Sequence, residues 1–171
     1  MEEEKYHTFM NYAGRVAIPG FIVPQKEYRT NTVYQPSPPV QFFDRGQFGI
    51  RLRDAIASNF SGLAEAQRPI ILNEGGVRIA IRILWPGYAS WEKWISVYGY
   101  SSNRPPITKS QLAYQIARKI HEFYEAKKDA NAEFTGTPDW CLCNIPFDQL
   151  SLLELRHVSP GSWQPVLAFI R

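Results

Sequence analysis

The aromatic segment 85–94 is the part of the chain best suited to hold a ligand. It reads Trp-Pro-Gly-Tyr-Ala-Ser-Trp-Glu-Lys-Trp and contains three of the five tryptophans. Trp91 and Trp94 are three residues apart, so on a helical turn they would share a face, and we expect them to be an exposed pair. With Tyr88 they would offer flat rings on which nucleobases or sugars could stack. The segment predicts a binding surface and contains no catalytic motif.

An excess of arginine precedes this segment. Positions 45 to 82 hold six arginines against three acidic residues. Arg78 and Arg82 fall on the face of an expected strand opposite its isoleucines, toward solvent or the N-terminal arm. Basic strands beside aromatic rings are typical of proteins that bind single-stranded nucleic acid. The formal net charge is only +3 and no RNA-binding signature is present. Nucleic-acid binding is therefore a second hypothesis, and carbohydrate binding stands beside it.

The histidines suggest little catalytic chemistry. Ser159, His157 and either Glu154 or Asp148 could be drawn as a nucleophile, base and acid. Close neighbours on one strand do not converge, however, and the chain has no nucleophile elbow. A weak ribonuclease built from His157, Glu154 and an arginine is a third hypothesis, and we lean toward a protein that is not an enzyme.

The two cysteines, Cys141 and Cys143, are separated by one residue. Structural zinc sites need four ligands and wider cysteine spacing. On an expected strand both side chains point to one face, with poor geometry for a disulfide. We expect packed free thiols, no metal and no cofactor, in a reducing cytoplasmic location. The acidic first residues are not a signal peptide, and no apolar run approaches a membrane span, so we expect no membrane partner.

The chain divides into an arm, residues 1–43, and one domain, residues 44–171. Prolines and a glycine interrupt the apolar residues of the arm, and the sequence Pro-Ser-Pro-Pro at 36–39 predicts an extended piece. Such an arm is suited to exchange between subunits. Interfaces are rich in tryptophan, tyrosine and arginine, and the chain has five tryptophans and nine tyrosines. Our first hypothesis is therefore a non-enzymatic binding protein that self-associates through its arm or its aromatic surface.

The elements expected in the domain alternate between helix and strand. A helix is predicted over 46–60, because Asp44 and Gln47 have capping-box spacing, and a second runs from Thr108, with Gln111 completing its box, to about 127. Strands are predicted over 69–72, 77–85, 140–145, 152–158 and 163–170, the first two joined by a turn at 74–76. The order predicts an α+β domain with a mostly antiparallel sheet of four to five strands and two helices on one face.

Two motifs in the second half of the chain carry a resemblance. The first is Ile-Arg-Ile-Leu-Trp-Pro-Gly-Tyr-Ala-Ser-Trp at 81–91, followed by Pro-Ile-Thr at 106–108. The second is Leu-Arg-His-Val-Ser-Pro-Gly-Ser-Trp-Gln-Pro at 155–165. In order and spacing, residues 77–167 resemble a group of small uncharacterised proteins of mushroom-forming fungi. The resemblance implies a fungal, cytosolic source and a lineage-specific role, with no activity attached.

The second motif also suggests a packing arrangement. Gly161 and Ser162 predict a turn, and Pro165 is suited to an edge strand. We expect Trp163 to fill the core or a groove and to meet the aromatic residues of 85–94 in one cluster. For that reason Trp163 joins Tyr88, Trp91, Trp94, Arg78 and Arg82 as a candidate binding residue.

Overall fold

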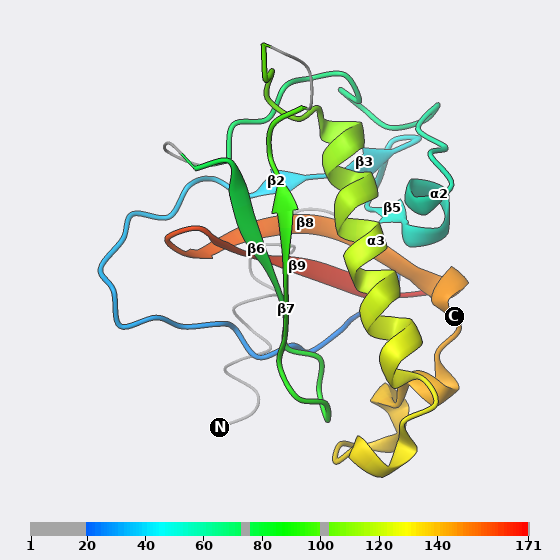
Figure 1. Ribbon diagram of the computed structural model, residues 1–171. Helices are drawn as coiled ribbons and strands as arrows, with labels where there is room; N and C mark the ends of the chain where they lie inside the picture. Colours follow the sequence, from blue (N-terminus) through cyan, green and yellow to red (C-terminus); the bar gives the residue numbers. More distant parts are fainter. Residues whose placement is uncertain (1–19, 73–75, 100–102, 171) are drawn as a thin grey trace.

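The computed structural model describes residues 20–72, 76–99 and 103–170, and within them seven strands form one sheet (Figure 1). The strand order is β2-β8-β9-β6-β7, with β5 also paired to β8 and β1 also paired to β9. Their bounds are β1 Phe21–Ile22, β2 Val40–Gln41, β5 Ile50–Arg51, β6 Arg78–Ile83, β7 Trp91–Ser96, β8 Leu150–Ser159 and β9 Ser162–Phe169. The pairs are antiparallel except β6 with β9.

This architecture is α+β and mostly antiparallel, as expected, but the expected number of strands, four to five, is wrong. Strands β1, β2 and β5 have two residues each. β1 and β2 lie in the arm, and β5 pairs with β8 next to β2. A strand of two residues gives no alternation that a sequence pattern could reveal.

The helix predicted over 46–60 is wrong for most of its length. Residues 43–48 form a tight hairpin of β3 (Phe43–Asp44) and β4 (Gln47–Phe48), and only α2 (Leu52–Ile56) is helical. Arg45 and Gly46 have φ angles of 51° and 76°, which make the hairpin turn, and Gly49 has a φ of 103°. Such backbone angles are incompatible with an α-helix. The Asp44–Gln47 spacing therefore belongs to strand pairing across a turn and not to a helix cap.

The second predicted helix is confirmed as α3 (Lys109–Lys127). Thr108 and Gln111 make the reciprocal capping box. One face of α3 is buried on the sheet through Leu112, Ala113, Ile116, Ala117, Ile120 and Phe123. Leu52 and Ala55 of α2 join the same core, so both helices cover one face of the sheet (Figure 1). We call this the helix face and the opposite one the arm face.

Strand β6 shows the alternation that its sequence predicts, but its predicted partner is wrong. Its isoleucines at 79, 81 and 83 are fully buried on the helix face, and Trp85 continues into the same core. Residues 69–72 do not pair with it, because the Ile70 amide donates to the Ile107 carbonyl instead. The predicted turn at 74–76 lies largely outside the described residues. β6 pairs with β7 and β9, whose buried side chains Ile95 and Trp163 belong to the same core as the isoleucines.

The strand predicted over 140–145 is also wrong. Residues 131–149 contain four short 3-10 turns: η1 Asn131–Glu133, η2 Pro138–Trp140, η3 Leu142–Asn144 and η4 Phe147–Gln149. This segment is held by hydrogen bonds from core side chains and not by main-chain pairing with a strand. The Trp85 indole donates to the Trp140 carbonyl (2.8 Å), and the Tyr124 hydroxyl donates to the Ile145 carbonyl (2.7 Å). Among the described helices, none has an apolar stretch that could cross a bilayer.

The strands predicted over 152–158 and 163–170 are confirmed as β8 and β9, but Pro165 lies on a central strand and not at an edge. On the side of β9 away from β8, β6 reaches only to Trp163 and β1 starts at Ala168. The arm fills the gap: the Val23 amide donates to the Leu167 carbonyl (2.9 Å), and the Gln25 side chain donates to the Pro165 carbonyl (2.7 Å). Proline is tolerated because the N–H that it lacks would face this gap.

The described part of the arm, residues 20–43, packs on its own domain. It starts beside β9, crosses the arm face at Tyr28, passes round the tip of the β8–β9 hairpin and returns as β2 on β8 (Figure 1). Near the tip, the Ser37 amide donates to Nδ1 of His157 (3.0 Å), and the Tyr34 ring packs edge-on against His157. The chain therefore encloses its own hairpin.

Candidate interaction surface

The six residues singled out from the sequence fall on two opposite faces of the sheet. Trp91 and Trp94 do not lie on a helical turn but on β7, where residues three apart point to opposite faces. The expected shared face of this pair is therefore wrong. Tyr88, Trp91 and Trp163 lie on the helix face, and Arg78, Arg82 and Trp94 lie on the arm face.

The helix-face residues take part in core packing. Tyr88 and Trp91 are half-buried, and their rings contact Phe123 of α3 edge-on, at centroid distances of 6.0 and 5.8 Å. Trp85 packs against the same phenylalanine at 6.3 Å. Trp163 is buried, and its ring stacks on His157 at 4.6 Å. Trp163 nevertheless belongs to the same hydrophobic core as Trp85, Tyr88 and Trp91.

Arg82 connects four parts of the structure on the arm face. Its guanidinium lies over the ring of Tyr28 (4.1 Å) and forms an ion pair with Glu92 of β7. Its Nε donates to the hydroxyl of Ser162 on β9 (3.1 Å). An arginine with three such partners holds the arm and the neighbouring strands together, and its donors are directed at its own chain.

Trp94 is the large aromatic side chain that the arm face presents to solvent. It is 52% exposed, and the Arg78 guanidinium lies 5.9 Å from its ring centre. Glu92 and Trp94 are exposed neighbours on the same face of β7. An indole standing on a strand surface beside charged groups is the type of residue that dominates binding energy at protein interfaces.

The outer edge of β7 is one of the two edges of the described sheet. β7 is the last strand in the order, next to β6. The Val97 amide donates to the Val77 carbonyl. By the alternation of an antiparallel pair, the amides and carbonyls of Glu92, Trp94 and Ser96 then point away from β6. Within residues 20–72, 76–99 and 103–170, no strand pairs with this outer edge.

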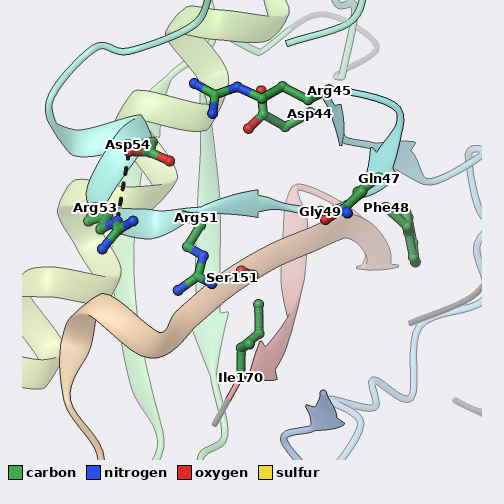
Figure 2. A pocket seen from close by; sticks show the side chains of 10 residues that line it. All are labelled: Asp44, Arg45, Gln47, Phe48, Gly49, Arg51, Arg53, Asp54, Ser151 and Ile170. Atoms are coloured by element: carbon green, nitrogen blue, oxygen red, sulfur yellow. Dashed lines mark ion pairs between the residues drawn. The ribbon is translucent and has the colours of Figure 1, made fainter. Parts of the chain in front are cut away.

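A second candidate is the shallow pocket at the hairpin of β3 and β4, with a volume of about 400 Å³ (Figure 2). Three arginines and two aspartates line it: Arg45, Arg51, Arg53, Asp44 and Asp54. Figure 2 shows them arriving from the hairpin, β5 and α2. The Arg51 guanidinium donates to the Asp148 carbonyl (3.1 Å), and Arg53 lies 3.9 Å from the Asp54 carboxylate. The two carboxylates offset two of the three positive charges, so the pocket has a net charge of one and attracts an anion no more strongly than a single exposed cation does.

The acid and the base of the ribonuclease hypothesis, Glu154 and His157, are not brought together. Glu154 is buried on the arm face, where it accepts hydrogen bonds from Arg156 and from the Gln41 side chain. His157 lies on the helix face, stacked on Trp163, with its Nδ1 bonded to the arm. A base and an acid on opposite faces of one strand cannot act on one substrate atom.

The cysteines depart most from expectation. Cys141 and Cys143 flank Leu142 in a 3-10 turn and are joined by a disulfide. Free thiols on a strand were expected, and the error follows from the wrong strand: a tight turn brings the two α-carbons to 5.2 Å. Cys141 is buried, whereas Cys143 is exposed. The described residues contain no group of three or more histidine, cysteine or acidic side chains placed to hold a metal ion.

No protein-family model, no curated protein and no solved structure matches the chain.

Proposed function

We propose that the protein is a binding protein that self-associates by pairing β7 with β7 of a second copy. The observation that carries the proposal is the outer edge of β7, where outward amides and carbonyls adjoin the exposed ring of Trp94. An open strand edge is a ready template for another strand, and main-chain hydrogen bonds across such an edge are a common mode of protein recognition.

The sequence of β7 favours one register for this pairing. In this register the two antiparallel β7 strands are centred on Trp94. Trp94 then lies opposite Trp94 of the second copy, and Glu92 lies opposite Ser96 of the second copy. All three outward residues then pair, which gives about six main-chain hydrogen bonds. A pair centred on Lys93 would place two ammonium groups opposite each other and leave Ser96 without a partner. The favoured register also brings two indole rings within contact distance on the arm face.

Nucleic-acid binding is the alternative function, and the Arg78–Trp94 contact supports it. The position of Arg82 argues against it, because that guanidinium already contacts Glu92, Ser162 and Tyr28. Sugar binding would also rest on the Trp94 ring alone. Binding of an oligonucleotide that weakens steeply with added salt would support the nucleic-acid alternative.

The test is the solution mass of the full chain, measured by light scattering after size exclusion over a range of concentrations. We expect a dimer, and we expect Trp94→Glu to give a monomer because it removes the ring and sets two carboxylates face to face. The matched control is Val33→Glu, since Val33 is an apolar arm residue that is 98% exposed. We expect this control to remain dimeric.

Two results would contradict the proposal. A wild-type chain that is monomeric at every concentration rules out stable self-association. A dimer that persists in Trp94→Glu, with an unchanged circular dichroism spectrum, places the contact elsewhere and favours exchange of the arm.

A further inference from the structure

We propose that the Cys141–Cys143 bridge is a reversible thiol–disulfide exchange site for small thiols, with Cys143 as the sulfur that is attacked. The bridge lies among the 3-10 turns of residues 131–149, which pack at the end of α3 (Figure 1). It shares no residue with β7, so the inference does not depend on self-association. Three features carry it: the small ring that the bridge closes, the unequal exposure of its sulfurs, and the partners of the Cys141 sulfur.

The bridge contributes little as a structural link. It encloses a single residue, Leu142, and the stabilisation that a disulfide gives through loop closure grows with the length of the loop. Other contacts already hold the segment, namely the Trp85 indole on the Trp140 carbonyl and the Tyr124 hydroxyl on the Ile145 carbonyl. The segment therefore keeps its place when the bridge opens.

The exposure of the two cysteines decides the direction of attack. Cys143 is exposed, whereas Cys141 is 5% exposed. A thiolate from solvent can reach the Cys143 sulfur while the core shields the Cys141 sulfur. Access to one sulfur of the pair is one of the factors that set the rate and the regiochemistry of exchange.

The Cys141 sulfur has a partner for each of its chemical states. The Tyr88 hydroxyl donates to it at 3.7 Å, and the Asn131 side-chain oxygen lies 3.9 Å away. A Cys141 thiolate would keep the hydrogen bond from Tyr88, and a Cys141 thiol could donate to Asn131. The Leu142 amide donates to the Tyr88 oxygen (2.9 Å), which strengthens the hydroxyl as a donor. Tyr88 thus stabilises the leaving thiolate.

The reaction balances with a monothiol as the reductant. The thiolate attacks the Cys143 sulfur, the bridge breaks, and its electron pair leaves on Cys141, which gives a mixed disulfide at Cys143. A second thiolate attacks the external sulfur of that mixed disulfide and releases Cys143 as a thiolate. Protons from the two thiols end on Cys141 and Cys143. The net change is reduction of the bridge to a dithiol and oxidation of two thiols to one disulfide.

The test uses the full chain equilibrated in glutathione buffers of varied ratio, quenched with acid, alkylated and weighed by mass spectrometry. We expect two alkylated cysteines in reducing buffer, none in oxidising buffer, and the same ratio at the midpoint from both directions. With oxidised glutathione, Cys141→Ser should form the mixed disulfide faster than Cys143→Ser, because only the former retains the exposed sulfur. Tyr88→Phe should slow reduction of the bridge about three- to tenfold. Tyr98→Phe should not, because Tyr98 is a half-buried tyrosine that pairs with Pro106 and, among the described contacts, makes none with either cysteine.

Three outcomes would overturn the inference. In the first, both cysteines are alkylated in the wild-type chain whatever the glutathione ratio. In the second, the two serine variants react at equal rates. In the third, Tyr88→Phe matches Tyr98→Phe. The wild-type and tyrosine measurements need no cysteine variant, so the test holds even if a serine substitution prevents folding.

Discussion

Two buried glutamines hold the arm to the sheet in a reciprocal way. Gln25, on the arm, donates to the Pro165 carbonyl of β9 (2.7 Å) and accepts from the Leu84 amide (3.1 Å). Gln164, on β9, accepts from the Tyr28 amide (2.9 Å) and donates to the carbonyl of Lys26 (2.8 Å). Each side chain therefore satisfies two main-chain groups: Gln25 bonds one group on β9 and one just after β6, and Gln164 bonds two groups on the arm. Methionine fills a similar volume without the polar atoms, so Gln25→Met and Gln164→Met isolate the hydrogen bonds.

The two substitutions should differ in cost. Gln25→Met leaves the carbonyl of buried Pro165 and the amide of half-buried Leu84 without partners. Each unsatisfied group costs about 1–3 kcal/mol, which gives about 2–6 kcal/mol in total. Gln164→Met leaves groups of Lys26 and Tyr28, an exposed and a half-buried residue that water can reach. Its cost should be about 1–2 kcal/mol. Gln35→Met is the matched control, because Gln35 is an exposed glutamine of the same arm.

Urea unfolding followed by tryptophan fluorescence measures these differences as shifts of the midpoint at an unchanged slope. The control should lie within about 0.5 kcal/mol of the wild type. The reasoning is refuted if Gln25→Met also lies within that range, or if Gln164→Met is the more costly of the two.

Three further predictions concern single positions. Lys109 lowers the pKa of Glu65 in the folded state. This pair therefore stabilises the fold at a pH above the ordinary glutamate range, and the stabilisation is lost as the pH falls through the lowered pKa. In acid titrations, the free energy of unfolding should fall more steeply with pH in the wild type than in Glu65→Gln. Gly49→Ala should destabilise by about 1–3 kcal/mol in urea, because φ is 103° and the new Cβ would stand 2.7 Å from a side chain of β8, whereas Gly46→Ala, with nothing within 4 Å, should cost less. Thr108→Ala should lower the free energy of unfolding by about 1 kcal/mol, because it removes the side-chain cap of α3, and a thermal melt will show it.

The elements that the sequence analysis predicted correctly are those with long, regular patterns. For α3, the sequence has seven apolar positions at helical spacing and a capping box at Thr108, and both predict the same helix. The isoleucines of β6 alternate over its whole length, and the turn at Gly161 separates β8 from β9. In each case the local conformational preference and the burial of one face in the fold favour the same element. Under that condition the sequence pattern alone is sufficient to predict the element.

The failures come from pairing between distant residues. The sequence 46–60 has helical spacing, but the positive φ angles at Gly46 and Gly49 turn β4 back on β3 in a local hairpin and lead β5 to a distant partner, β8. The parallel contact of β6 with β9 joins residues about 80 positions apart, as in Ala80 with Ser162, and no local pattern encodes it.

The candidate site was only partly predictable for a similar reason. Trp94, Arg78 and Arg82 were found from their types, but the position of β7 at the edge of the described sheet depends on which strand comes last in its order. The proximity of Cys141 and Cys143 required knowledge of the 3-10 turn between them.

The path of the arm around the β8–β9 hairpin has a consequence for the order of folding. On the ribosome, residues 20–41 emerge long before residues 154–169, which supply their partners from Glu154 to Phe169. The arm can bind to β8 and β9 only after β9 has been synthesised and has left the exit tunnel. Its docking therefore cannot precede the formation of β9, and it joins segments of such high sequence separation that loop closure should limit its rate. A nascent chain stopped before residue 162 would lack both the central strand and the site on which its own beginning settles.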